Sequence, residues 1–399
     1  MKKICFISPG ILPVPNTLGG AIETLLTNII TENEYYNKAN ITIISSYENG
    51  AYKISKSYKN TSIKYIKSSK LEIKLYNLLY RLIRKVFKKK LNFSSLYYLK
   101  SYRILKKYNY DYIVVEGGDY LELKKIVDYF GKKNIYLHIH HQLIPNIELD
   151  AIFDNIIGTS NFVNKEWERN SSNKNLHKYV VYNCVNENYF NKKISNNERR
   201  TIREKLGFEK DDFIVIYCGR IIKEKGVKEL VQAVNLIENK KIKLLIVGSI
   251  NFALECTDEY LRSIESFVKK SDNKIKFTGY IANEEVFKYY QTADVQVIPS
   301  ICEEAAGLVS IEGMLSGLPL IVTKSGGLNE YVSDECSIKI SKEKNLVVHI
   351  KEAIEKLYND KNMYNNMKLA GLKRSNYFKM NKYYEDILNI FLGEEDEKK

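Results

Sequence analysis

Short apolar runs alternate with longer amphipathic stretches along this chain, and the series occurs twice. The first series opens with KICFISPG at 3–10 and the second with FIVIYCGR at 213–220. Further strands are predicted at 41–45, 112–116, 135–140, 156–160 and 180–183, and in the second series at 243–248, 274–279, 295–299 and 318–323. Strands that alternate with helical stretches are typical of parallel sheets covered by helices. The pattern therefore predicts an α/β protein with two doubly wound, Rossmann-like parallel-sheet domains.

A polar stretch separates the two series. Residues 185–207 are mostly polar or charged, so we place the domain boundary near residue 190. This predicts one domain over 1–190 and a second over 191–375. Residues 343–392 are predicted to be helical, so the second domain ends inside this helical run. Ligands of open parallel sheets bind beyond the carboxyl ends of the strands. We therefore expect the chemistry at strand ends in both domains, which face each other across a cleft.

The composition excludes several classes of protein. The 399 residues are 44% apolar, with only 6 Pro and 20 Gly, which excludes a disordered or collagen-like chain. No apolar run approaches the roughly 20 residues that span a bilayer. The opening MKKICFISPGILPVP lacks a signal-peptide pattern, so we expect a cytoplasmic protein. The 6 Cys include no C-x-x-C pair, so no zinc or disulfide framework is predicted.

The formal net charge is +14, and the basic residues gather in one segment. Between Ile73 and Tyr110 there are eleven Lys or Arg and no acid, with apolar residues at helical spacing. This favours an amphipathic helix in 73–110 that contacts an anionic membrane surface. The alternative is a basic helix packed on the sheet by its apolar stripe. A nucleic-acid partner is not expected, since no nucleic-acid-binding module is recognisable.

The segment PSICEEAAGLVSIEGMLSGLP at 299–319 is the strongest local motif. A predicted strand ends at Pro299 and a helix begins near Gly307, with Glu304 before the helix and Glu312 inside it. Both carboxylates can face one ligand at the helix start, where unpaired N–H groups suit a phosphate. The alternative is a solvated acidic loop followed by a helix packed in the core.

A second motif, GRIIKEKG at 219–226, follows a predicted strand directly. Arg220 and Lys225 lie at the mouth of the second sheet, where a guanidinium fork and an ammonium can hold phosphate oxygens. Two such cations would stabilise the charge of a leaving diphosphate. The alternative is a basic surface turn.

A third motif, PNTLGGAIETLL at 15–26, places Gly19 and Gly20 before a helix. This is an anion-binding geometry or a tight turn, and it is neither G-x-G-x-x-G nor a P-loop. No D-x-D follows a predicted strand, which argues against a metal-bridged nucleotide-sugar site. We therefore expect no metal and no cofactor.

Three of the five histidines gather at one strand end, in IYLHIHHQ at 135–142. His138 and His140 share a face because strand side chains alternate. A metal site is conceivable, but no acidic ligand is adjacent in the sequence. The alternatives are a hydrogen bond to a substrate hydroxyl and a structural role.

Taken together, these motifs resemble the family-4 glycosyltransferases, which are retaining enzymes with the two-domain GT-B fold. The resemblance rests on the segments 19–26, 135–141, 181–190, 219–226, 277–300 and 303–330. The closing YFKMNKYYEDILNIF resembles the family's C-terminal helix, so 376–392 is expected to cross back to the first domain.

The resemblance implies a role for each matching residue. Arg220 and Lys225 would hold the donor diphosphate, Glu304 would bind the donor sugar and Glu312 the ribose. The active-site histidine maps to His140, with His138 as the second choice. The remaining donor-binding positions are Gly19, Gly20, Gly219, Gly307 and the amides of Leu308 and Val309 near the phosphates, with Tyr280 and Ile281 near the base.

The implied function is transfer of a sugar from a nucleotide-diphosphate donor, expected to be a UDP-sugar. The acceptor would be a hydroxyl of a glycan or a lipid-linked molecule in cell-surface polysaccharide or glycoconjugate synthesis. Two alternatives stay open, namely a nucleotide-sugar epimerase of the same fold and a non-catalytic subunit that binds a partner transferase.

Overall fold

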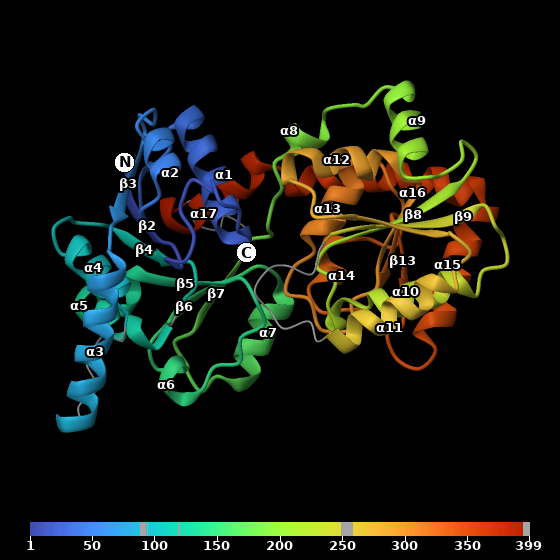
Figure 1. Cartoon of the computed structure of the whole chain (residues 1–399). Helices are drawn as coiled ribbons and strands as arrows, with labels where there is room; N and C mark the ends of the chain where they lie inside the picture. Colours follow the sequence, from blue (N-terminus) through green and yellow to red (C-terminus); the bar gives the residue numbers. More distant parts are fainter. Residues whose placement is uncertain (88–92, 94, 119, 249–257, 394–399) are drawn as a thin grey trace. The chain divides into compact units, whose positions relative to one another are not determined.

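The computed structural model describes the chain except residues 88–92, 94, 119, 249–257 and 394–399 (Figure 1). Two compact units are present. Unit 1 comprises Met1–Asn183 and Met380–Lys399, and unit 2 comprises Cys184–Lys379. The predicted boundaries lie at residues 190 and 376, whereas the chain passes from one unit to the other at 183/184 and 379/380.

Unit 1 is built on a seven-stranded parallel sheet of order β3-β2-β1-β4-β5-β6-β7. The strands are β1 (Lys3–Ile7), β2 (Asn40–Ser46), β3 (Thr61–Ile66), β4 (Tyr112–Val115), β5 (Ile135–Ile139), β6 (Asn155–Gly158) and β7 (His177–Val180). The strand order reverses its direction between β1 and β4. This is the switch point at which ligands bind in open parallel sheets.

The helices of unit 1 connect these strands. They are α1 (Ala21–Tyr36), α2 (Asn49–Ser55), α3 (Lys70–Phe87), α4 (Leu96–Leu105), α5 (Lys124–Phe130), α6 (Ile147–Asp150), α7 (Asn161–Asn170) and α17 (Met380–Leu392), with 3₁₀ turns η1 (Tyr120–Leu123) and η2 (Lys132–Asn134).

Unit 2 has a six-stranded parallel sheet of order β10-β9-β8-β11-β12-β13, with its switch point between β8 and β11. The strands are β8 (Phe213–Cys218), β9 (Ile242–Val247), β10 (Ile275–Gly279), β11 (Val295–Ile298), β12 (Leu320–Thr323) and β13 (Ser337–Ile340). The two parallel sheets confirm the predicted α/β class.

Helices cover both faces of the second sheet. Figure 1 shows α10, α11 and α15 on one face and α12, α13 and α16 on the other. The helices and 3₁₀ turns are α8 (Glu187–Phe190), α9 (Asn196–Lys205), η3 (Lys223–Lys225), α10 (Val227–Asn235), α11 (Asp258–Lys269), α12 (Asn283–Thr292), α13 (Leu308–Leu315), α14 (Leu328–Tyr331), α15 (Leu346–Asn359), α16 (Lys361–Ser375) and η4 (Asn376–Phe378).

The strand prediction missed β3 and β13 and placed β7 too late, at 180–183. These three strands lie at or next to a sheet edge, and their sequences TSIKYI, SIKI and HKYV mix polar and apolar residues. Strands with one partner or one covered face are half-exposed, so they lack the continuous apolar run of a central strand.

Helix α17 completes unit 1, although it follows unit 2 in the sequence, and it packs beside α1 (Figure 1). The Tyr384 hydroxyl donates a hydrogen bond to Asn33 Oδ1 (2.6 Å) and accepts one from the Lys38 amide (3.2 Å). The Phe391 ring contacts Tyr112 and Tyr136, with centroid separations of 5.2 and 4.9 Å. The last helix therefore closes the core of the first sheet.

The basic segment predicted at 73–110 is two different structures, apart from residues 88–92 and 94, which lie outside the described residues. Helix α3 extends away from the sheet (Figure 1), and Leu75, Leu78 and Leu82 are each about half exposed. Helix α4 instead buries Leu96, Tyr98 and Leu105. Of the two helices, α3 therefore presents its apolar stripe to solvent and α4 does not. Across the helices that the structure describes, none has the length and apolar character to cross a bilayer.

Replacing Phe391 by Ala should destabilise unit 1. The side chain is 2% exposed and packs between two tyrosine rings, so its loss should cost about 3–5 kcal/mol of unfolding free energy. Urea unfolding followed by circular dichroism measures this. Leu369→Ala, at a side chain 65% exposed on α16, is the control and should change the free energy by less than about 0.5 kcal/mol. A loss below about 1 kcal/mol for Phe391→Ala would contradict the packing role of α17.

Candidate functional site

The turn after β8 lies directly against the end of β11. Gly226 has φ +68°, and a Cβ at this position would lie 2.0 Å from the Pro299 carbonyl oxygen. The Glu224 carbonyl accepts hydrogen bonds from the amides of Ile301 (2.8 Å) and Cys302 (3.2 Å). The motifs at 219–226 and 299–319, which are separate in the sequence, therefore form one surface at the switch point of unit 2.

Lys225 and Glu304 form an ion pair on this surface, with 2.5 Å between Nζ and Oε1. The Ser300 hydroxyl donates to the same carboxylate oxygen. The Glu304 amide donates to the Ser325 hydroxyl at 3.0 Å, which fixes the backbone of the loop. The structure thus brings two of the predicted residues into contact and adds Ser300, which the sequence analysis did not single out.

Arg220 and Gly219 follow β8 on the same turn. The Arg220 side chain is exposed, and its backbone carbonyl accepts a hydrogen bond from the Tyr217 hydroxyl at 2.6 Å. Within the described part of the chain, the Arg220 guanidinium forms no ion pair. It can therefore approach an anion without first breaking a salt bridge.

Helix α13 begins where the sequence predicted, one residue after Gly307. A Cβ at Gly307 would lie 2.7 Å from Leu328 Cδ1, so glycine lets the helix start close to α14. Leu308 and Val309 are its first residues, and amides of a first helical turn have no partner inside the helix. The helix start thus offers N–H groups to a negative ligand.

Glu312 lies in α13 and accepts a hydrogen bond from the fully buried Tyr290 hydroxyl at 2.8 Å. Burial raises the pKa of Glu312 to about 7, and the Tyr290 hydrogen bond offsets only part of this effect. Cys218, at the end of β8, interacts with the same hydroxyl, and burial raises the pKa of its thiol to about 12. The carboxyl group is therefore the member of this group that titrates near neutral pH.

The other predicted donor-binding residues lie at further strand ends. Tyr280 and Ile281 follow β10, and the Tyr280 side chain is 61% exposed. In unit 1, Gly19 and Gly20 precede α1. A Cβ at Gly20 would lie 2.1 Å from Glu23 Oε2, whereas one at Gly19 would meet no atom within 4 Å.

The histidines of unit 1 surround a buried acid. Glu116 Oε2, just after β4, lies 2.7 Å from His140 Nε2 and 3.0 Å from His138 Nδ1. The side chains of Glu116, His138 and His140 are 1%, 0% and 8% exposed. Because β4 and β5 are neighbours in the sheet, residues 24 apart in the sequence meet at one edge.

This acid corrects the expectation that no acidic ligand is adjacent to the histidines. Glu116, His138 and His140 each have a ligand atom within 4.8 Å of the others, and they are the one such group among the described residues. Burial raises the pKa of Glu116, but His138 and His140 outweigh burial and hold it at about 2. Burial and His138 lower the pKa of His140 to about 4, so its ring is neutral at pH 7.

Sequence reasoning missed Glu116, Tyr290 and Ser300. A signal existed for Glu116, because YIVVEGG places an acid directly after a buried strand and before two glycines. Ser300 likewise follows a strand, but hydroxyl residues in such positions are common. Tyr290 lies within a helix, and only the tertiary structure brings its hydroxyl to Glu312.

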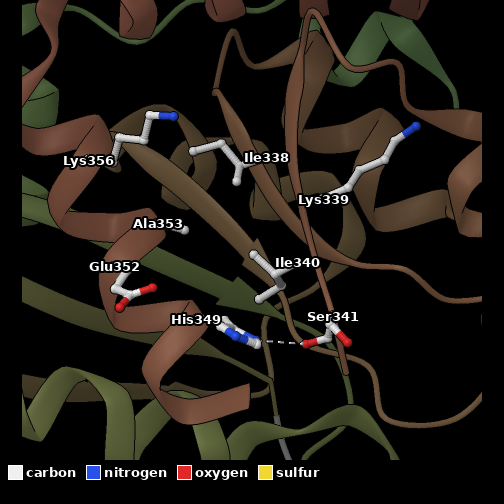
Figure 2. A pocket seen from close by; sticks show the side chains of 8 residues that line it. All are labelled: Ile338, Lys339, Ile340, Ser341, His349, Glu352, Ala353 and Lys356. Carbon is white, nitrogen blue, oxygen red and sulfur yellow. Dashed lines mark hydrogen bonds between the residues drawn. The ribbon is translucent and has the colours of Figure 1, made fainter. Parts of the chain in front are cut away.

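A pocket of about 350 Å³ lies elsewhere in unit 2, between β13 and α15 (Figure 2). Its lining contains none of the predicted site residues. Figure 2 shows Lys339 and Lys356 on opposite sides of the pocket, and His349 Nδ1 lies 3.5 Å from the Ser341 carbonyl oxygen. The charged groups do not converge on a common point, so we base no function on it.

The raised pKa of Glu312 predicts a pH-dependent stability. Below pH 4.5 the carboxyl is protonated in both states; between 4.5 and about 7 only the unfolded state ionises, so stability falls as pH rises and levels off above 7. Glu312→Gln removes this loss, so its advantage in unfolding free energy over the wild type should grow by about 1–3 kcal/mol between pH 4.5 and 8. Urea unfolding at both pH values measures it. Parallel pH curves for the two proteins would contradict a buried, proton-holding Glu312.

The chain is similar to proteins that are named as glycosyltransferases. Residues 198–374 match the family model of glycosyl transferases group 1. The lipopolysaccharide 1,2-N-acetylglucosaminetransferase of Salmonella typhimurium is 24% identical over 344 residues, 84% of this chain and 83% of that protein. CapM of Staphylococcus aureus, a capsular polysaccharide biosynthesis glycosyltransferase, is 31% identical over 195 residues, 47% of this chain and 49% of CapM. An uncharacterized glycosyltransferase of Methanocaldococcus jannaschii is 31% identical over 157 residues, 39% of this chain and 38% of that protein.

Solved structures show the same fold. A glycosyltransferase from Rickettsia africae has a TM-score of 0.75 at 17% identity, covering 98% of this chain and 97% of that chain. HepE of Anabaena, solved in complex with UDP, has a TM-score of 0.72 at 17% identity, with coverage of 98% and 99%. The two parallel sheets, the ordered motifs and these matches agree. Residues 198–374 therefore match the group 1 glycosyl transferases, and the chain as a whole has the GT-B fold.

Proposed function

We propose that the protein is a retaining glycosyltransferase that transfers a sugar from a UDP-sugar to a hydroxyl of a glycan or lipid-linked acceptor in cell-surface polysaccharide or glycoconjugate synthesis. The observation that carries the proposal is the assembly of Lys225, Glu304 and the start of α13 at one switch point. Relatives named for lipopolysaccharide and capsule synthesis, and a neighbour solved with UDP, support the substrate class.

The positive groups of unit 2 act on the leaving diphosphate. As the bond from the sugar to the diphosphate breaks, negative charge grows on the phosphate oxygens. Arg220, Lys225 and the first amides of α13 stabilise this charge, and fixed donors cost little reorganisation during the reaction. Because Glu304 already holds Lys225 at the end of β11, less side-chain entropy is lost when the lysine meets a phosphate.

The two carboxylates bind hydroxyl groups of the donor. Glu304 accepts from the sugar and Glu312 from the ribose, since a carboxyl group keeps an acceptor oxygen in either protonation state. Tyr280 and Ile281 contact the base. Departure of the nucleotide diphosphate gives the sugar oxocarbenium character, and the acceptor attacks from the same face with help from a donor phosphate oxygen. The cations and helix amides supply the positive charge, so the reaction requires no metal and no cofactor.

Two measurements separate this function from the alternatives. Incubation with the donor alone gives a new nucleotide sugar if the protein is an epimerase, because an epimerase needs no acceptor. Isothermal titration with nucleotide sugars gives no heat if the protein is a non-catalytic subunit. A thermal-shift panel of UDP- and GDP-sugars selects the donor, because a bound ligand raises the melting temperature.

Arg220→Ala should slow transfer about 100-fold, because one lost donor to the transition-state charge costs about 3 kcal/mol. Nucleotide release from the selected donor, with acceptor present, measures the rate. Lys223→Ala is the matched control, since Lys223 is an exposed lysine of the same turn. It should retain the wild-type rate, and all proteins should keep their circular dichroism spectra. Wild-type turnover in Arg220→Ala would contradict the assigned role.

We further propose that α3 holds the protein on an anionic membrane. The apolar stripe of Leu71, Leu75, Leu78, Leu82 and Val86 is between 49% and 66% exposed. Arg81, Arg84 and Lys85 lie on the same helix, and an exposed apolar stripe with basic neighbours is typical of helices that lie in the headgroup layer. The buried apolar face of α4 restricts this contact to α3.

Wild-type protein should float with phosphatidylglycerol-rich vesicles at low salt, and less so as salt screens the charges. The double variant Leu78→Glu, Leu82→Glu should lose flotation, because two charges enter the apolar stripe. Leu369→Glu introduces a charge at an exposed leucine on α16 and is the control. Equal flotation of all three proteins would show that α3 is not the membrane contact.

A further inference from the structure

The hydrogen bond between Glu116 and His140 fixes where the imidazole proton lies. The carboxyl is ionised, because the two histidines hold its pKa at about 2, and an ionised carboxylate can only accept. At 2.7 Å from Glu116 Oε2, His140 Nε2 must therefore carry the proton. Because the ring is neutral, Nδ1 has no proton and is an acceptor.

The second ring nitrogen of His140, Nδ1, makes no hydrogen bond with Glu116. It is buried and has no hydrogen-bond partner among the described residues. A buried acceptor without a donor costs free energy, so a ligand hydroxyl at this atom would restore a lost hydrogen bond. The His140 side chain is 8% exposed, in contrast to the fully buried His138, so only His140 is within reach of a ligand.

His138 contacts both Glu116 and His140. Its ring packs on the His140 ring, with 4.1 Å between centroids and 43° between planes. Its Nδ1 lies 3.0 Å from the same oxygen of Glu116. One oxygen of Glu116, buried at the carboxyl edge of the sheet, thus faces both rings.

We propose that Glu116 is a positioning residue that keeps His140 in the Nε2–H tautomer, so that Nδ1 accepts a hydrogen bond from a sugar hydroxyl of the substrate. The inference rests on the proposed function, since it takes His140 as a substrate-binding residue. No proton is transferred in this role. The carboxylate sets the direction and the acceptor character of the imidazole, which in turn orients the hydroxyl.

A cation bound by the same three side chains is the competing interpretation. Its ligand atoms would need a wider spacing. Two ligands at about 2.0–2.1 Å from a tetrahedral zinc ion lie more than about 3 Å apart. The 2.7 Å between Nε2 and Oε2 is instead the length of a charge-assisted hydrogen bond. The distance therefore favours a hydrogen bond from His140 Nε2 to Glu116 Oε2 over a bound metal ion.

Histidine-selective ¹⁵N NMR on the full chain tests the tautomer without any substrate. The chain has only 5 His, and His140→Gln identifies the signal. Wild-type His140 should show a protonated Nε2 and an unprotonated Nδ1. In Glu116→Gln the neutral amide can donate to Nε2, so the Nδ1–H form should appear. Glu116→Asp keeps the carboxylate and should retain the Nε2–H form. A wild-type Nδ1–H tautomer, or no change in Glu116→Gln, would overturn the proposal.

Kinetics with the donor selected by thermal shift give the second readout. Glu116→Gln should lower kcat about 10- to 100-fold, as loss of a carboxylate that orients a functional histidine does elsewhere, and Glu116→Asp should recover part of it. Glu122→Gln is the control, since Glu122 is another buried glutamate of unit 1 and accepts from the Ser95 amide. Wild-type kcat in Glu116→Gln, with Arg220→Ala inactive, would overturn the proposal and keep the proposed function. If the proposed function is wrong, the wild type will be inactive although His140 still shows the Nε2–H tautomer.

Metal analysis of the purified protein decides the competing interpretation. No metal should accompany the wild type, and added Co²⁺ should give no ligand-field absorption. One metal per chain that is absent from both Glu116→Gln and His140→Gln would overturn the proposal in favour of a cation site.

Discussion

The close approach of Gly226 to the Pro299 carbonyl is the constraint on which the site of unit 2 depends. A Cβ there would lie 2.0 Å from the carbonyl oxygen, so any other residue would separate the turn after β8 from the end of β11. Parallel strands bring their carboxyl ends to one edge, and this contact, together with the two hydrogen bonds to the Glu224 carbonyl, brings Lys225 to Glu304. The juxtaposition of Lys225 and Glu304 therefore follows from backbone contacts that involve no charged group.

Each unit holds a carboxyl group that is shielded from water, Glu116 fully and Glu312 in part, and the pKa values of the two groups shift in opposite directions. Burial alone raises the pKa of a carboxyl in either place. Glu312 has one neutral hydroxyl partner, and its pKa rises to about 7. Glu116 lies between two histidines, and its pKa falls to about 2. The number and charge of the partners therefore decide the protonation state, although the cost of desolvation is common to both.

The central strands and the motifs at their ends could be predicted from the sequence because each is a local pattern. FIVIYC is apolar throughout since neighbours cover both faces of β8, and the loop after it carries Arg220 and Lys225. Edge strands β3 and β13 could not be found this way, because their polar positions resemble those of a loop.

Contacts between residues that are distant in the sequence could not be predicted without knowing the order of the strands in the sheet. Glu116 and His140 meet because β4 pairs with β5. The local sequence of a strand does not show which other strand it pairs with. Likewise, the basic segment has one composition, yet α3 exposes its apolar stripe and α4 buries its own. Composition alone cannot tell a helix that has a sheet to pack on from one that does not.

The family match, at 198–374, falls within unit 2, which holds the residues assigned to the donor. The exposed α3 and the Glu116 cluster both lie in unit 1, outside this match. The membrane contact proposed for α3 and the proposed role of Glu116 therefore both concern unit 1, whereas the residues that match the family concern the donor side in unit 2.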